Sequence, residues 1–353
     1  MTILYGIDEP TQSPLVSDEE IRSIIRDEYG IVKAKITHLT GYEDCNMRLE
    51  EIEYDEKITK TMKEKPKEAI VKVTNPIEAR YDAHIELQHN VYATFRKAGI
   101  PTVSPIRRLD GRLWAPIELL PGLKLPVRLF HLLPGRNLEN FPFTPELCFQ
   151  IGALLARIHK CFDAMDVKKT TESHLPFISP ENHRCIEREA HVLVAKKMLS
   201  KERFDLVKTI FDDFRKTILD NEPLDYGLIH SDINETNVLI EENDGKLEIS
   251  GVLDFGDMHF SHRVFDIAAC VLYLHLSDSQ LKQGIPEIEK NILLGYTSQR
   301  EFREAEKLRS AMRARLACSL LYGLRTARLN VRCSSTEYVL RTQSNGWQVL
   351  IEV

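Results

Sequence analysis

Two short stretches decide the fold: residues 230–237 read HSDINETN, and residues 254–256 read DFG. The segment between them predicts two strands joined by a tight turn at residues 243–245, which read NDG. Either stretch alone is common in surface loops, but both in this order, separated by a strand–turn–strand unit, are not. We therefore interpret them as one site, because the hairpin returns the chain so that Asn237 and Asp254 converge.

The residue types in these two stretches suit phosphoryl transfer. That reaction needs one carboxylate to orient the attacking hydroxyl and accept its proton, and it needs ligands for the Mg²⁺ that bridges the phosphate oxygens. Asp232 fits the first task. Asn237 and Asp254 offer an amide oxygen and a carboxylate, which are the hard oxygen donors that Mg²⁺ prefers. The sequence thus predicts Asp232 as the catalytic base and Asn237 with Asp254 as metal ligands.

The segments around this site change character along the chain. The first part predicts mostly strands, at 31–39, 46–54, 69–73, 103–109, 113–118 and 126–132. Two helices accompany them, one at 17–29 with a Ser-x-x-Glu capping box and a long one from Pro76 to Lys97. Later the helical period dominates, at 145–162, 180–220, 261–276, 279–297 and 299–330. This layout predicts an α+β, protein-kinase-like fold with two lobes, a β-rich N-terminal lobe over residues 1–131 and a mainly helical C-terminal lobe over residues 132–353.

Lys72 is a candidate phosphate contact. It is the one charge in the apolar strand AIVKV at 69–73, where it is either an edge lysine facing water or the lysine that reaches the phosphates. Its acidic partner is expected on the following helix. Glu86 is centrally placed there, whereas Glu78 lies in the first turn, where the helix dipole equally explains an acid. We favour Glu86.

Two further segments are expected to contact the nucleotide. The turn TGYEDCN, with Gly41 and Tyr42, stands where a phosphate-covering loop belongs, although it contains a single glycine. The stretch 127–132, which includes Phe130 and His131, is expected to meet the nucleobase through backbone hydrogen bonds. Side chains in that stretch say little about which base is used.

Composition excludes several classes of protein. The 353 residues carry 47 basic and 53 acidic side chains, a net charge of −6, whereas a nucleic-acid binder needs a basic surface. Neither Gly-x-Gly nor a P-loop motif occurs. No apolar stretch approaches the ~18 residues of a membrane span, no secretory signal is recognisable, and seven scattered cysteines favour reduced thiols. We expect a cytoplasmic protein that binds neither nucleic acid nor membrane; its oligomeric state stays open.

At these motifs the chain resembles the aminoglycoside phosphotransferase/choline kinase superfamily of small-molecule kinases. The resemblance also runs through AIVKVTN, ELQHNVYATFRKAGIPT and VRLFHLLPGRNL, so it covers most of the chain. After DFG the sequence passes directly to FDIA at 265–268, without the activation segment of protein kinases, which is typical of the small-molecule branch. Ser231 departs from the superfamily, where glycine is common. Within the superfamily, the chain is most similar to the hydroxylysine kinases.

The resemblance implies the same roles for the residues already named: Asp232, Asn237, Asp254, Lys72 and Glu86. It also implies Mg²⁺ with ATP or GTP as the phosphoryl donor. The implied acceptor is a small hydroxylated amine or amino acid, above all 5-hydroxy-L-lysine.

Such an acceptor needs charged partners in the protein. Asp257 could face an ammonium, and Arg315 could hold a carboxylate by a bidentate pair. A helix-capping Asp257 and an Arg315 that bridges acids within the helical lobe are equally simple explanations. Choline or an aminoglycoside are alternative acceptors, and choline would need an aromatic cage. A non-catalytic pseudokinase fits less well, because Asp232, Asn237 and Asp254 are all intact.

Overall fold

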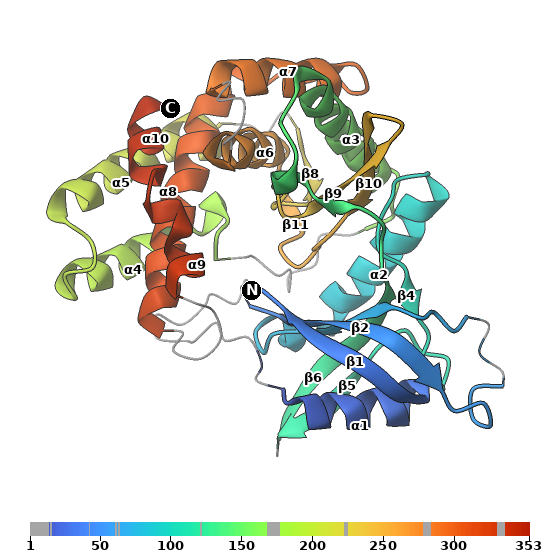
Figure 1. Cartoon of the computed structure of the whole chain (residues 1–353). Coiled ribbons are helices and arrows are strands. Elements are labelled where there is room, and N and C mark those ends of the chain that lie inside the picture. The colour runs from blue at the N-terminus through green and yellow to red at the C-terminus, as the bar shows by residue number, and fades with distance from the viewer. Residues whose placement is uncertain are drawn as a thin grey trace.

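The N-terminal lobe is built on a six-stranded antiparallel sheet (Figure 1). The computed structural model describes residue 14 and residues 16–41, 43–60, 62, 64–120, 122–167, 177–221, 225–277, 284–329 and 336–353. The strand order is β1-β2-β3-β6-β4, with β5 paired to β6. The strands are β1 (Ile31–Leu39), β2 (Cys45–Tyr54), β3 (Ala69–Val73), β4 (Pro105–Ile106), β5 (Ala115–Leu120) and β6 (Leu123–His131). Burial alternates along β3, so one face of the sheet lies on a hydrophobic cluster.

Helix α1 (Asp18–Tyr29) packs on this cluster through Ile21 and Ile25. Its start is fixed by the capping box: the Glu20 N–H donates to the Ser17 hydroxyl, and the Ser17 N–H donates to the Glu20 carboxylate at 2.7 Å. Gly30 ends the helix in the left-handed region, with φ of 66°. The predicted helix and both of its ends are confirmed.

The predicted helix from Pro76 to Lys97 is wrong in its first turn. A 3₁₀ turn, η1 (Glu78–Arg80), comes first, and α2 (Asp82–Lys97) begins after it. The Asn75 side chain causes the break, because its Oδ1 accepts from the N–H groups of Ile77 and Glu78 at 3.0 and 2.9 Å. As a result Glu78 lies on a short turn of its own rather than on the first turn of the long helix.

The predicted hairpin after residue 237 is confirmed. Strands β9 (Val238–Asn243) and β10 (Lys246–Val252) pair antiparallel around Asp244 and Gly245, which both have positive φ, at 52° and 75°. Such values are those of the tight hairpin turn that Asp-Gly favours. β7 (Arg136–Asn137) extends this small sheet, and β8 (Tyr226–Ile229) pairs with β11 (His259–His262) beside it.

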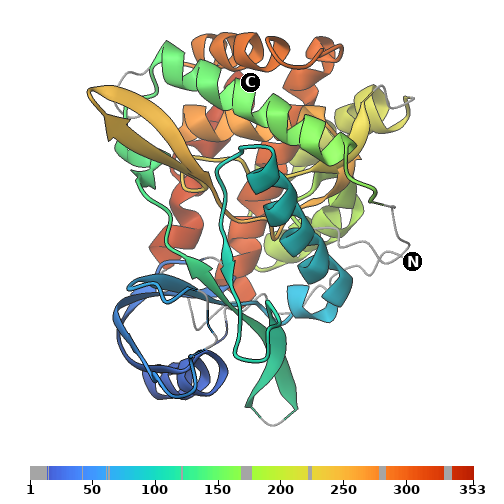
Figure 2. The same ribbon diagram turned by 90° about the vertical axis from the view of Figure 1, so that its right-hand side faces the viewer.

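The C-terminal lobe is mainly helical, and α2 reaches from the sheet into it (Figure 2). The longer helices are α3 (Pro145–Asp163), α4 (His183–Ala195), α5 (Lys201–Phe214), α6 (Val264–Ser277), α7 (Ile285–Thr297) and α8 (Leu308–Leu329). Two short ones, α9 (Thr336–Leu340) and α10 (Gly346–Glu352), follow with the 3₁₀ turn η6 (Arg341–Gln343) between them. Two predicted starts are too early, since β11 takes residues 259–262 and α8 begins at Leu308.

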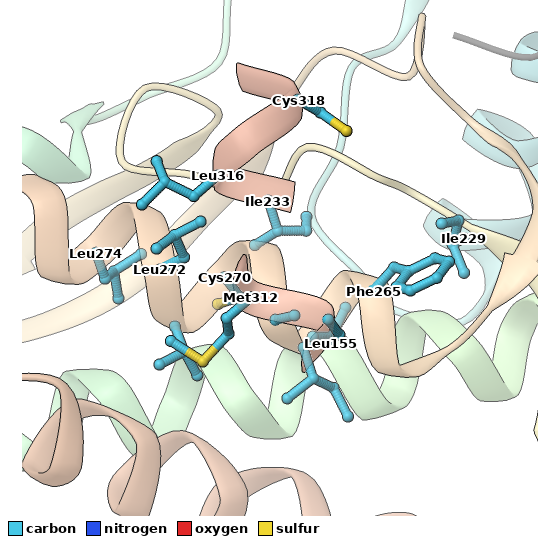
Figure 3. Packing of buried hydrophobic residues seen from close by; sticks show 14 of the residues in the cluster. Leu155, Ile229, Ile233, Phe265, Cys270, Leu272, Leu274, Met312, Leu316 and Cys318 are labelled. Atoms are coloured by element: carbon cyan, nitrogen blue, oxygen red, sulfur yellow. The ribbon is translucent and has the colours of Figure 1, made fainter. Parts of the chain in front are cut away.

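The core of this lobe lies between α3, α6 and α8 (Figure 3). It includes Leu155 of α3, Phe265 and Leu272 of α6, and Met312 and Leu316 of α8. Close approach of α3 and α7 requires glycine, because a Cβ at Gly152 would lie 2.0 Å from the Ile292 carbonyl oxygen. Within the described residues, every helix is either too short or too polar to traverse a lipid bilayer. The α+β, two-lobe, kinase-like architecture is therefore the one predicted.

Candidate active site

A cavity of about 1000 Å³ lies between the sheet and the helical lobe. Among its described lining residues, eight carry a carboxylate and three carry a permanent positive charge. The carboxylates are Glu43, Asp44, Glu78, Glu139, Asp232, Glu235, Asp254 and Asp257, and the cations are Arg48, Lys72 and Arg341. This excess of negative charge favours a ligand that brings positive charge, such as an ammonium or a metal ion.

Asp232 lies in this cavity, in the loop that follows β8. Its Oδ2 accepts from the side-chain amides of Asn237 at 2.8 Å and Asn234 at 3.0 Å. Burial raises the pKa of Asp232, and the nearby Arg315 opposes that rise. The carboxylate is thus held in one orientation by donors on one oxygen, which suits a group that must accept a proton at a fixed place.

The loop itself is held by a residue that the sequence analysis did not single out. Both oxygens of Asp266, on α6, accept backbone N–H groups, from His230 at 2.8 Å and from Ser231 at 2.5 Å. His159 of α3 contacts the same carboxylate at 2.9 Å. Ser231 adopts φ of 74°, in the left-handed region that favours glycine, so the backbone of the loop is held there at a cost in conformational energy. Asp266 of the FDIA segment therefore holds the loop that carries Asp232.

Arg315 does not lie where the sequence analysis expected it. It is 1% exposed, and the described residues that line the cavity do not include it. Its guanidinium donates to the carbonyls of Ile178 and Ser231, both at 3.0 Å, and approaches Asp232 Oδ1 at 3.4 Å. The expected substrate contact is wrong, because Arg315 is enclosed behind the loop and positions Asp232 from there.

The hairpin brings the backbone at Asn237 next to that of Leu253 and Asp254, which is the geometry that the predicted pair of metal ligands requires. Val238 pairs with Val252 at its open end, and the next N–H group, from Leu253, donates to the Asn237 carbonyl at 2.8 Å. The Asn237 amide nitrogen is used by Asp232, so its amide oxygen is the atom left for a metal. Both side chains line the cavity. One carboxylate and one amide oxygen fit Mg²⁺, which usually takes few protein ligands and completes its shell with phosphate and water.

Lys72 lies among three carboxylates of the cavity, close to Asp254. Its Nζ is 2.5 Å from Asp44 and 3.1 Å from Asp254. Burial alone would lower the pKa of Lys72, but Asp254, Asp44 and Glu78 together raise it. Lys72 in turn holds the pKa of Asp254 below its usual value, against the effect of burial. Lys72 is therefore a fixed positive charge next to the expected metal ligands.

Glu86 does not accompany Lys72, and the expected pair is wrong. Glu86 is exposed and accepts from the Trp114 indole N–H at 2.6 Å. Of the two glutamates, Glu78 is the one whose charge acts on the lysine, after Asp254 and Asp44: it lines the cavity, is 4% exposed and accepts from Gln88 at 2.6 Å. A Cβ on Gly256, in DFG, would lie 3.1 Å from Glu78 Oε2. The break at Asn75 is the reason. It directs the Glu78 side chain into the cavity, whereas Glu86, at the centre of α2, lies on the exposed side of that helix.

The turn between β1 and β2 covers the part of the cavity near Lys72. Gly41 lines the cavity, and a Cβ there would lie 2.6 Å from the Asp44 carbonyl oxygen, so the tight turn needs glycine. Tyr42 lies outside the described residues. Asp44, which the sequence analysis missed, also accepts from the Asn75 backbone N–H at 2.8 Å. The covering loop is thus tied to the start of η1.

Phe130 and His131 both line the cavity at the end of β6. Phe130 is buried against Tyr92, with ring centroids 5.8 Å apart. The His131 N–H already donates to the Ser104 carbonyl at 2.9 Å. Backbone groups directed at a nucleobase are therefore expected just beyond, at Leu132 and Leu133, which line the cavity as well.

Asp257 lines the cavity three residues after Asp254. Burial, followed by the charge of Asp232, raises the pKa of Asp257 to about 8, with Arg315 opposing the rise. A positively charged ligand next to it would lower that pKa and keep the carboxylate ionised. The helix-cap explanation is not supported, because Asp257 precedes β11 and not a helix.

Comparison with known proteins extends the similarity over nearly the whole chain. Residues 59–288 match the model of the phosphotransferase enzyme family. The hydroxylysine kinase of Xenopus laevis is 26% identical over 96% of this chain and 89% of its own length, and that of Bos taurus is 25% identical over the same shares.

Solved structures agree on the fold. An amicoumacin kinase, in complex with AMP-PNP and Ca²⁺, superposes with a TM-score of 0.70 at 15% identity, covering 96% of this chain and 94% of its own. A microcompartment-associated aminopropanol kinase also gives 0.70, at 16% identity, covering 95% of each chain.

Proposed function

The chain belongs to the phosphotransferase enzyme family, as a small-molecule kinase that phosphorylates an alcohol, and we propose that its acceptor is an amino-acid alcohol, first of all 5-hydroxy-L-lysine. The observation that carries this proposal is the presence of Asp232 and Asp257 in one cavity. Asp232 is the base for a hydroxyl, and Asp257 is a second carboxylate for a neighbouring ammonium. The named activity of the Xenopus laevis and Bos taurus relatives supports the choice of acceptor.

In the proposed reaction Asp232 accepts the proton of the acceptor hydroxyl while the hydroxyl oxygen attacks the γ-phosphorus. The bond from that phosphorus to the bridging oxygen breaks, and the nucleoside diphosphate leaves. The amides of Asn234 and Asn237 and the guanidinium of Arg315 hold the base in place. Lys72 offers its positive charge to the phosphate oxygens.

A divalent cation with a nucleotide fits this end of the cavity. Asn237 and Asp254 would hold it, and it would neutralise the charge that develops on the phosphate oxygens. We propose Mg²⁺ for this place, with ATP or GTP as donor. The backbone of Leu132 and Leu133 would meet the edge of the base, and both purines can use such contacts.

Choline is the second candidate, because Phe177, Tyr273 and Tyr322 line the cavity. A quaternary ammonium needs the open faces of aromatic rings. Two of these faces already have a cation: the Arg325 guanidinium lies 4.7 Å from the Phe177 ring centroid, and the Arg315 guanidinium 5.4 Å from that of Tyr273. The rings are therefore a poorer cage than their number indicates, which favours the primary ammonium.

A panel of acceptors with both donors tests the proposal. The full chain is assayed with ATP and with GTP, each with Mg²⁺, on 5-hydroxy-L-lysine, homoserine, ethanolamine and choline, and the phosphorylated product is identified. We expect the highest kcat/KM for 5-hydroxy-L-lysine. Asp232→Asn should lower kcat by about 10²- to 10⁴-fold while nucleotide still raises the melting temperature.

Other results would contradict the proposal. Preference for choline would establish the second candidate, and turnover of none of the four acceptors would exclude the whole class. If Asp232→Asn kept more than about a tenth of the wild-type kcat, Asp232 would not be the base.

A further inference from the structure

An amino-acid acceptor brings a carboxylate, and the structure removes the residue that was expected to bind it. Arg315 is enclosed behind the catalytic loop, with its guanidinium on two carbonyls and on Asp232. A carboxylate left without a partner in a cavity so rich in acids would be repelled. The cavity must therefore offer another cation if the acceptor is an amino acid.

The permanent cations among the described lining residues are Arg48, Lys72 and Arg341. Arg48 lies on β2 opposite Ile70 and pairs with Glu68 at 2.9 Å, on the sheet side of the cavity. Lys72 is the cation that we propose for the phosphate oxygens. Arg341 alone of the three comes from the helical lobe, where Asp257 and Tyr273 also line the wall.

Arg341 is anchored to the catalytic loop itself. Its Nη2 is 2.7 Å from Glu235 Oε1, and its Nη1 is 3.5 Å from Glu139 Oε2. Glu235 follows the base Asp232 by three residues and is 8% exposed in its side chain, so the guanidinium is attached to a rigid group close to the reacting hydroxyl. The Arg341 side chain is nevertheless 47% exposed, so a ligand in the cavity can reach it.

The cavity wall around Arg341 is polar. Thr342, Ser344 and Asn345 line the cavity next to it, on η6 and the start of α10. The Ser344 hydroxyl already donates to the Arg341 carbonyl at 2.9 Å, and the Asn345 amide nitrogen lies 3.4 Å from the Leu276 carbonyl. The Thr342 hydroxyl and the second N–H of the Asn345 amide are therefore the donors of this group that can reach a carboxylate beside the guanidinium. Arginine also offers a planar fork of N–H donors that matches the two oxygens of a carboxylate.

We propose that Arg341 binds the carboxylate of the amino-acid acceptor, with Glu235 and Glu139 holding the guanidinium in place. This assignment rests on the proposed function, because it requires an acceptor with a carboxylate. It makes the segment after α8 the part of the molecule that separates amino-acid alcohols from simple amino alcohols. The acceptor then spans from Asp232, at its hydroxyl, to Arg341, at its carboxylate.

The test compares two acceptors that differ only in the carboxylate: 5-hydroxy-L-lysine and the diamino alcohol obtained by its decarboxylation. Arg341→Gln should lower kcat/KM for the amino acid by about 10- to 10²-fold, mainly through KM, because the bound carboxylate loses its cationic partner in a cavity lined by acids. The same variant should lower kcat/KM for the diamino alcohol by a factor at least about tenfold smaller, and that common part reports the loss of the Glu235 ion pair rather than of a carboxylate contact. Turnover of the diamino alcohol shows at the same time that the variant is folded.

Two further variants sharpen the result. Arg341→Lys keeps the charge without the fork and should recover part of the loss on the amino acid. Arg303→Gln is the matched control, since Arg303 is 71% exposed, pairs with Glu301 and is not among the described lining residues. It should act on both compounds like the wild type.

The outcomes separate the two proposals. If the wild type phosphorylates neither compound, the proposed function fails and the Arg341 assignment fails with it. If the wild type phosphorylates the amino acid but Arg341→Gln loses the same factor on both compounds, or on neither, only the Arg341 assignment is overturned.

Discussion

The two ends of the cavity are built in different ways. At the end where we propose the nucleotide, Asn237 and Asp254 flank a single hairpin, and Lys72 comes from the strand β3 beside its covering loop. At the acceptor end, the lining comes from segments far apart in the chain: residues 177–178, α6, α8 and residues 339–345. The difference explains why motifs predict candidate residues for phosphoryl transfer, whereas candidate acceptor residues depend on how distant helices pack.

The comparison also concerns two arginines of the acceptor end. Arg315 is 1% exposed and acts on Asp232 from behind, and Arg341 is 47% exposed in its side chain at the cavity wall. Both bind groups of the same catalytic loop. Exposure, which the sequence does not reveal, is the reason we propose positioning for Arg315 and substrate recognition for Arg341.

The largest effect is expected at the nucleotide end. Asp254→Ala should lower kcat by at least about 10³-fold and abolish the Mg²⁺-dependent part of nucleotide affinity, because Asp254 meets the nucleotide only through the ion. Lys72→Ala should weaken affinity with or without the metal. Calorimetric titration of nucleotide with and without Mg²⁺ measures both, and equal Mg²⁺ dependence in wild type and Asp254→Ala would refute the assignment.

Arg315→Met separates positioning from recognition at the acceptor end. It should lower kcat by about 10- to 10²-fold on 5-hydroxy-L-lysine and on the decarboxylated analogue alike, because the base loses its support. Arg315 opposes the raised pKa of Asp232, so the acidic limb of the pH–rate profile should move to higher pH. A loss confined to the amino acid would return Arg315 to the role of substrate contact. Circular dichroism checks that the variant is folded.

Glu78→Gln and Glu86→Gln are a matched pair on neighbouring elements. Glu78→Gln should lower kcat/KM for the nucleotide by about tenfold or more, because Lys72 loses one of the carboxylates around it. Glu86→Gln should stay within about twofold, since Glu86 contacts Trp114 at the surface. Steady-state kinetics with varied nucleotide decide between them, and the reverse order would restore the pairing of Lys72 with Glu86.

The smallest effect is on the free energy of unfolding at acidic pH, and it depends on His89, which packs against Phe130 of the cavity wall. His89 is 5% exposed, stacks on Phe130 at 6.4 Å, and neither ring nitrogen has a hydrogen-bond partner among the described residues. Burial, with Arg128 and Arg96, lowers its pKa to about 3. Below pH 6.5 the unfolded chain therefore binds a proton that the folded protein does not, so stability falls as the pH falls.

His89→Phe removes that dependence while keeping an aromatic ring on Phe130. The free energy of unfolding should drop less between pH 7 and pH 5 in the variant than in the wild type, by about 2 kcal/mol. Urea titrations at both pH values measure it. The same drop in both proteins would show that His89 is protonated in the folded state.

The sequence predicted the fold and the centre of the site because both depend on short-range patterns. Alternation, caps and the Asp-Gly turn predicted helix α1, the hairpin and most of the strands, although the strand predicted at 103–109 is reduced to Pro105–Ile106. The hairpin places the backbone of Asn237 next to that of Leu253 and Asp254. The error at Glu78 had a visible signal, since Asn75 before Pro76 is able to cap a short turn. The FDIA segment at 265–268 is likewise a sequence signal for Asp266, although the motif alone does not say what its carboxylate contacts.

By itself, then, the amino-acid sequence determined a kinase-like fold and the family, and it predicted a loop for phosphoryl transfer, because these depend on residues within a few turns of one another. Only the tertiary structure decided which acid accompanies Lys72, which arginine is enclosed behind Asp232 and which one reaches the cavity. Such choices depend on burial and on the packing of α8 and the turn after α9 against the catalytic loop. The hydrophobic periodicity of the sequence cannot predict these contacts, because Arg315 and Arg341 both lie on helical segments and differ only in their neighbours in space.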